Sequence, residues 1–104
     1  MCKSKIFTEL LIVVSDVTEI KQDIIISPVR REEVVDARSL FIYILSDYYG
    51  FKPNSIADFL GCTPMNVHKH LNSFKNRLKN NQMLEIYYKL IINKVQTNNR
   101  LTIN

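Results

Sequence analysis

Apolar residues recur along this chain at intervals of three or four, the spacing that places them on one face of an α-helix. Longer stripes run from Phe7 to Val17 and from Val34 to Tyr49. Shorter ones cover Ser55 to Leu60, Val67 to Leu78 and Met83 to Ile91. The pattern predicts five helices. The second is expected at the centre of the molecule because it is apolar on several sides.

The remaining segments are short and contain the residues that break helices. The sequence has only two glycines and three prolines, and they fall between the stripes, at Pro28, Gly50, Pro53, Gly61 and Pro64. The run Ile24–Ile26 would suit a strand, but it has no pairing partner, so we expect an apolar connector. With no repeat or low-complexity segment, residues 1–104 are predicted to form one all-α domain, a five-helix bundle.

The segment from about residue 55 to residue 79 has the pattern of a helix-turn-helix. Gly61 suits the left-handed conformation that closes a first helix. Thr63 is a good N-cap for a second, and Pro64 is favoured at the first helical position, where its missing N–H costs nothing. In proteins that bind DNA through this motif, the second helix lies in the major groove.

The outward face of that second helix has the chemistry of a nucleic-acid contact. Asn pairs with adenine edges, Met meets thymine methyl groups, and Lys neutralises phosphate. With the Val67–Leu78 stripe buried, the outward residues are Met65, Asn66, Lys69, His70, Asn72, Ser73 and Asn76. Short helical hairpins and Lys/Asn-rich solvated faces are also common in proteins that bind no nucleic acid, and that alternative stays open.

Charge is distributed unevenly along the chain. Residues 1–50 carry six Lys/Arg against eight Asp/Glu, whereas residues 51–104 carry eight against two, so the second half holds the whole excess behind the net charge of +4. No acidic residue occurs from Cys62 to Met83. This asymmetry favours an anionic partner for one side of the domain, although many basic faces are only solvated.

The segment from Ile24 to Phe74 resembles the C-terminal DNA-binding domain of the bacterial replication initiator DnaA, a helix-turn-helix domain of the tryptophan-repressor-like class. With Thr8 to Asp23 similar to the family's preceding helix and linker, the resemblance covers roughly residues 5–80. The matching residues, in order, are Ser27, Arg30, Val34–Arg38, Tyr43–Leu45, Ser55–Gly61 and Val67.

The resemblance implies a set of DNA contacts. The arginine matching Arg30 enters the minor groove in that family, and the one matching Arg38 contacts the phosphate backbone. The turn at Pro53–Asn54 also approaches DNA, and we expect Lys52 and Thr63 to support the same contact. The predicted DNA-binding residues are therefore Arg30, Arg38, Lys52, Asn54, Thr63, Met65, Asn66, Lys69, His70 and Ser73.

The head of the second helix departs from the family. The family has Asp-His-Thr-Thr-Val there, whereas this chain has Thr63–Pro64–Met65–Asn66–Val67, with one residue fewer after the glycine. The preferred DNA sequence is therefore expected to differ from the initiator's. The chain also has no phosphate-binding glycine loop, so it is expected to be a stand-alone relative of the initiator's last domain. We expect it to serve in replication or transcription control, and mobile-element maintenance stays open as an alternative.

Residue clusters that suggest catalysis or metal binding have simpler explanations. His68 and His70, two apart on a helix, point about 200° apart and cannot share one ion. Cys62 precedes that helix, and the sequence places no further metal-ligating residue near it that would complete a site. The acids Glu32, Glu33 and Asp36 stand at a helix start, where they offset the positive end of the dipole. We therefore expect no enzyme activity, no metal, no cofactor and no small-molecule substrate.

The rest of the sequence suggests a location and an alternative role. No apolar run has the length of about 20 residues that spans a membrane, and no cleavage site follows Lys3 and Lys5, so we expect a cytoplasmic protein with no membrane partner. The last helix is apolar on more than one side. The main prediction is sequence-preferring binding of double-stranded DNA; the alternative is a protein-interaction module, with a homodimer formed through the last helix.

Overall fold

The computed structural model describes residues 3–103, and side-chain surroundings are described for residues 4–97. Within this span the chain is all-helical, as predicted, and contains no strand. Its six helices are α1 (Lys3–Thr18), α2 (Gln22–Ile25), α3 (Glu32–Asp47), α4 (Pro53–Leu60), α5 (Pro64–Asn80) and α6 (Gln82–Ile103). The five predicted helices correspond to α1 and to α3 through α6.

The sixth helix, α2, corrects the predicted count of five. It is a single turn inside the stretch expected to be a connector, and the carbonyl of Lys21 accepts hydrogen bonds from the amides of Ile24 and Ile25, both at 3.0 Å. Ile25 is fully buried, whereas Ile26 is partly exposed. Four residues are too few to show a helical period in a sequence, so the apolar pattern alone does not reveal this turn.

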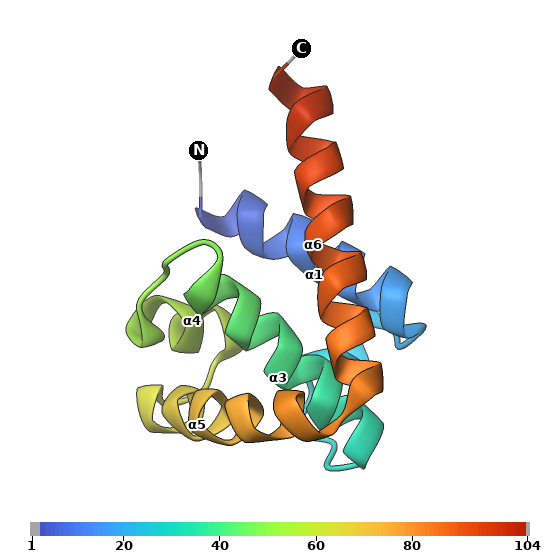
Figure 1. Ribbon diagram of the computed structural model, residues 1–104. Helices are drawn as coiled ribbons and strands as arrows, with labels where there is room; N and C mark the ends of the chain where they lie inside the picture. The colour runs from blue at the N-terminus through green and yellow to red at the C-terminus, as the bar shows by residue number, and fades with distance from the viewer. Residues whose placement is uncertain (1–2, 104) are drawn as a thin grey trace.

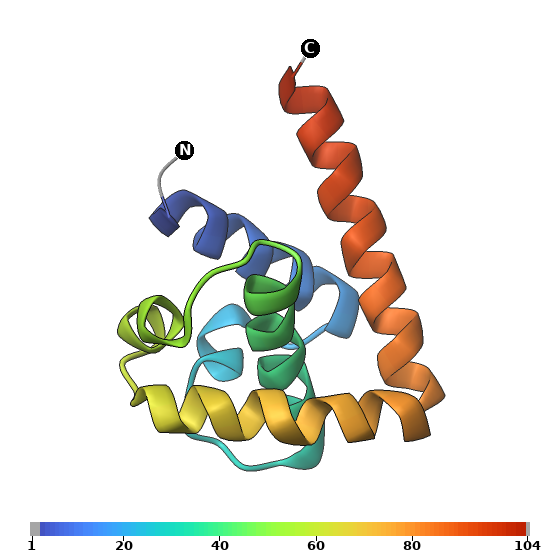
Figure 2. The same ribbon diagram turned by 60° about the vertical axis from the view of Figure 1, so that its left-hand side comes forward.

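Helix α3 occupies the middle of the molecule, as its apolar pattern predicted. It contacts all five of the other helices. Figure 1 shows α1 and α6 on one side of it and α4 and α5 on the other. Helix α6 starts beside the end of α5, crosses α1, and its C-terminal part extends beyond the rest of the bundle (Figures 1 and 2).

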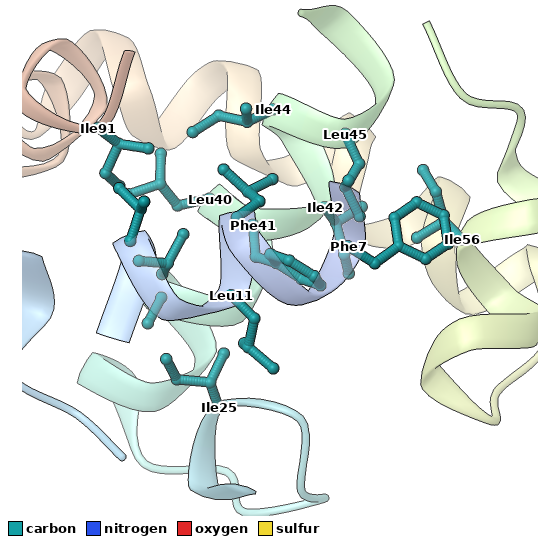
Figure 3. Close-up of a cluster of buried hydrophobic side chains, with 14 of the residues drawn as sticks. Phe7, Leu11, Ile25, Leu40, Phe41, Ile42, Ile44, Leu45, Ile56 and Ile91 are labelled. Atoms are coloured by element: carbon teal, nitrogen blue, oxygen red, sulfur yellow. The ribbon is translucent and has the colours of Figure 1, made fainter. Parts of the chain in front are cut away.

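The core forms where α1, α3, α4 and α6 meet (Figure 3). Phe41 on α3 is fully buried, and the ring of Phe7 on α1 lies edge-on to Phe59 on α4, with centroids 4.7 Å apart. Fully buried aliphatic side chains surround these rings: Leu40, Ile44, Leu45, Ile56 and Ile91. Because α3 packs against both α4 and α5, it positions the helices that carry most of the predicted site.

None of the helices among the described residues is both long enough and apolar enough to cross a lipid bilayer.

Candidate functional site

The turn between α4 and α5 has the geometry predicted from its sequence. Gly61 closes α4 in the left-handed region at φ 69°, and the amide of Cys62 donates to the carbonyl of Ala57 at 3.0 Å. Thr63 caps α5, since its Oγ1 accepts a hydrogen bond from the amide of Asn66 at 3.3 Å. A left-handed glycine and a side-chain cap together set the direction in which α5 leaves the turn.

Helix α5 is attached to the bundle along one side only. Val67 and Phe74 are fully buried, and the Phe74 ring lies 5.0 Å from that of Tyr43 on α3. Near the end of α5, the guanidinium of Arg77 forms an ion pair with Asp36 on α3. These contacts turn the opposite side of α5 toward solvent at the edge of the molecule (Figure 2).

The outward side of α5 carries most of the residues predicted for it. Met65 is 67% exposed, more than any other large apolar side chain among the described residues. Lys69 is exposed and, among the described side chains, has no acidic partner within ion-pair distance. The other exposed residues on this side are Asn66, Asn72, Ser73 and Asn76. Among the described residues, the outward side of α5 is therefore a cationic, amide-rich surface on which Lys69 has no acidic partner.

His70 lies between this surface and α3. Its Nδ1 is 2.7 Å from the hydroxyl of Ser39, a fully buried residue of α3. Burial, together with the nearby charge of Arg38, lowers the pKa of His70. One edge of the ring therefore holds α5 against α3, and contact of His70 with a base stays a prediction for the other edge.

Arg38 ties α3 to the connector that precedes it. Its Nε donates to the carbonyl of Ile25 at 2.8 Å, and its Nη2 donates to the carbonyls of Ser27 and, at 3.0 Å, Val29. Burial lowers the pKa of this guanidinium. The resemblance assigns Arg38 to the phosphate backbone, but three of its five N–H groups are already engaged within the protein. These bonds join Arg38 to the connector that carries Arg30, and its contact with the phosphate backbone stays a prediction.

A cleft of about 710 Å³ lies between this connector, α3 and the first turns of α5. Arg30 and Arg38 line it on the side of the connector and α3, while Asn66 and His70 line it from α5. Figure 2 shows the connector passing beside α5. The structure thus brings together four of the predicted residues that are separated by up to forty positions in the sequence.

The remaining predicted residues lie at the ends of helices. Lys52 is the N-cap residue of α4 and is exposed, and Asn54 is exposed in the first turn of that helix. Thr63 occupies the N-cap of α5. Their contact with DNA stays a prediction.

The sequence analysis did not predict the roles of two residues that support the site. Ser39 supports His70 and Asp36 pairs with Arg77, at separations of 31 and 41 positions. No local pattern marks such pairs, because they depend on how α3 and α5 pack. For Asp36 the helix-start explanation is incomplete: its carboxylate also meets a guanidinium from another helix.

Among the described side chains of residues 4–97, no group of three His, Cys, Asp or Glu is close enough to hold a metal ion. Cys62 is half-buried and burial raises the pKa of its thiol, so it stays in the protonated, weakly reactive form. His68 is exposed, whereas His70 faces Ser39, so the two imidazoles lie in different surroundings.

Comparison of the sequence with known protein families and with curated proteins finds no match. The resemblance to the initiator's DNA-binding domain therefore rests on the residues quoted for it, and the evidence on function comes from the exposed side of α5 and its surroundings.

Proposed function

We propose that this chain binds double-stranded DNA with a sequence preference, through a helix-turn-helix formed by α4 and α5. The observation that supports this function best is the outward side of α5: Met65, Asn66 and Lys69 are exposed at its head, and no acidic side chain of the described residues neutralises Lys69. This proposal implies the fold of the initiator's C-terminal domain, and the process proposed is replication or transcription control.

The dimensions of α5 suit a major groove. An α-helix with its side chains is about 10–12 Å across, and the major groove of B-DNA is about 12 Å wide. Asn66 in the first turn is placed to donate and accept at an adenine edge, and Met65 to contact a thymine methyl group. Lys69, one turn later, and Ser73 reach adjoining phosphates.

The connector supplies a second contact in this proposal. Arg30 is exposed beside the first turns of α5, where a guanidinium is suited to a narrow, electronegative minor groove. Lys52 and Asn54 contact the backbone from the start of α4. Arg38 acts chiefly through the connector, because most of its donors bind carbonyl groups there.

Selection of duplexes from a random pool, followed by fluorescence anisotropy on the selected site, tests this function. With about five phosphates neutralised, the logarithm of the affinity falls with the logarithm of the salt concentration with a slope of about −4 to −5. No selected sequence, or a slope near zero, would refute DNA binding.

Two matched pairs of variants test whether α5 is the helix that contacts DNA. Asn66→Ala on α5 is expected to cost about 1–3 kcal/mol of binding on the selected site and to relax its specificity, whereas Asn93→Ala on exposed α6 leaves binding unchanged. Lys69→Gln weakens binding to all sequences and lowers the salt slope by about 1, whereas Lys89→Gln on α6 does not. Equal effects of the α5 and α6 variants would exclude α5 as the recognition helix.

A second candidate function, homodimer formation through α6, is favoured by one observation. Met83, Ile86 and Leu90, at intervals of three and four along α6, are each about half exposed and share one side of that helix. Light scattering of the purified protein tests it: a dimer that Ile86→Glu converts to a monomer supports an α6 interface. A monomer at millimolar concentration excludes it.

A further inference from the structure

The cleft between the connector and α5 has features that the proposed DNA contacts do not explain. Those contacts include Arg30 and Asn66, which line the cleft, but they leave out most of its lining between the Ile26–Arg30 segment, α3 and the head of α5. Its volume of about 710 Å³ falls within the range of small-molecule sites, about 300–1,000 Å³. Its chemistry is therefore considered separately.

The cleft is electropositive and holds one guanidinium in a fixed orientation. Nε and Nη2 of Arg38 bind three carbonyls, which leaves the two N–H groups of Nη1 without a partner among the described residues. Arg30 stands at the rim and is exposed. Among the residues that the structure describes, no Asp or Glu lines the cleft. A guanidinium that is already immobile loses little further freedom when it binds an anion, which favours binding.

The same cleft has an apolar side. Ile26 is 39% exposed there, and Val35 and Leu60 are only partly buried. A DNA phosphate has no apolar part that would cover these side chains. A ligand that contacts both the electropositive and the apolar side needs a negative charge attached to a flat hydrocarbon group. A ring then packs along the aliphatic side chains, and its charged substituent reaches the guanidinium.

We propose that this cleft binds a small aromatic carboxylate. The carboxylate accepts hydrogen bonds from Nη1 of Arg38 and from Arg30, and the ring packs against Ile26, Val35 and Leu60. Asn66 and His70 close the opposite wall. Since Arg30 and Asn66 are also proposed DNA contacts, an occupied cleft competes with DNA; this consequence rests on the proposed function, but binding of the carboxylate does not.

Titration of the ¹⁵N-labelled protein followed by NMR tests the site, with three probes at constant ionic strength: benzoate, benzamide and inorganic phosphate. Benzoate is expected to bind with a Kd on the order of millimolar, typical for so few atoms, and to shift the amides of Cys62, Asn66 and His70. Benzamide, with the ring but no charge, and phosphate, with the charge but no ring, are each expected to bind at least about tenfold more weakly. Phosphate binding as tight as benzoate, or no saturable shift with benzoate, overturns the proposal.

Variants test which residues of the cleft bind the carboxylate and which bind the ring. Arg30→Gln is expected to weaken benzoate about tenfold, and the neighbouring Arg31→Gln, outside the cleft and paired with Glu33, to leave it unchanged. Ile26→Ser replaces an exposed side chain and weakens benzoate but not phosphate. If Arg31→Gln weakens benzoate as much as Arg30→Gln, binding is non-specific and the cleft is not the site.

A competition experiment distinguishes the proposed carboxylate site from the proposed DNA binding. Where the protein binds its selected duplex, saturating benzoate raises the apparent Kd for DNA, and benzamide does not. Benzoate binding without any DNA binding supports the cleft and refutes only the proposed function, whereas DNA binding without benzoate binding does the reverse.

Discussion

Replacing Arg38 by Met tests whether its guanidinium holds the connector against α3. Methionine keeps most of the aliphatic stem of arginine, so the packing of the side chain is largely retained. The substitution removes the donors to the carbonyls of Ile25, Ser27 and Val29. The change in stability therefore reports chiefly on these three hydrogen bonds.

The structure sets the size of the expected effect. Each hydrogen bond from a charged group contributes about 1.5–3 kcal/mol in mutational studies. Three bonds from one guanidinium are not additive, and the carbonyls of an exposed connector regain water when the guanidinium is lost. We therefore expect Arg38→Met to lower the free energy of unfolding by about 2–4 kcal/mol, a large part of the 5–15 kcal/mol typical of a domain.

Urea denaturation followed by circular dichroism measures this loss as a lower midpoint with an unchanged m-value. Arg31→Met is the matched control, because Arg31 is exposed and its nearest acidic oxygen, on Glu33, is 3.8 Å away. That variant is expected to stay within about 0.5 kcal/mol of the parent protein. A similarly small loss for Arg38→Met, with unchanged hydrogen exchange at the connector amides, would show that the guanidinium does not hold the connector.

Three further predictions concern the attachment of α5. Thr63→Ala removes the N-cap and is expected to cost about 1 kcal/mol in urea denaturation, whereas Thr63→Ser retains the stability; equal losses would exclude the hydroxyl as a cap. Phe74→Ala leaves a cavity beside Tyr43 and is expected to cost about 3–5 kcal/mol; a change in melting temperature of only a degree or two would contradict this packing. Because burial and the charge of Arg38 lower the pKa of His70, the folded chain binds fewer protons than the unfolded chain. The contribution of neutral His70 to the stability of the fold is complete above the pKa of histidine in the unfolded chain, about 6.5. This contribution is lost as the pH falls toward the lower pKa of the folded state. Urea midpoints from pH 7.5 to 5 are expected to fall more steeply for the parent protein than for His70→Gln, and parallel curves would contradict the expectation.

Much of this molecule follows from local features of its sequence. Helical periodicity predicted α1 and α3 through α6, and the left-handed glycine Gly61, the cap Thr63 and Pro64 predicted the turn before α5. Burial of Val67 and Phe74 then left Met65, Asn66 and Lys69 exposed, as the pattern indicated. These features depend on residues within about one turn of each other, where backbone geometry determines which side chains share a face.

The tertiary structure alone decided which partners the polar side chains found. The sequence marks Arg38 and His70 as candidate DNA contacts, but packing places the first against carbonyls up to 13 positions away and the second against Ser39. The cleft between Arg30 and Asn66 and the pairing of Asp36 with Arg77 arise in the same way. The physical reason is distance along the chain: periodicity and capping act between neighbours in sequence, whereas a guanidinium or an imidazole binds whichever group the packed helices bring within 3 Å.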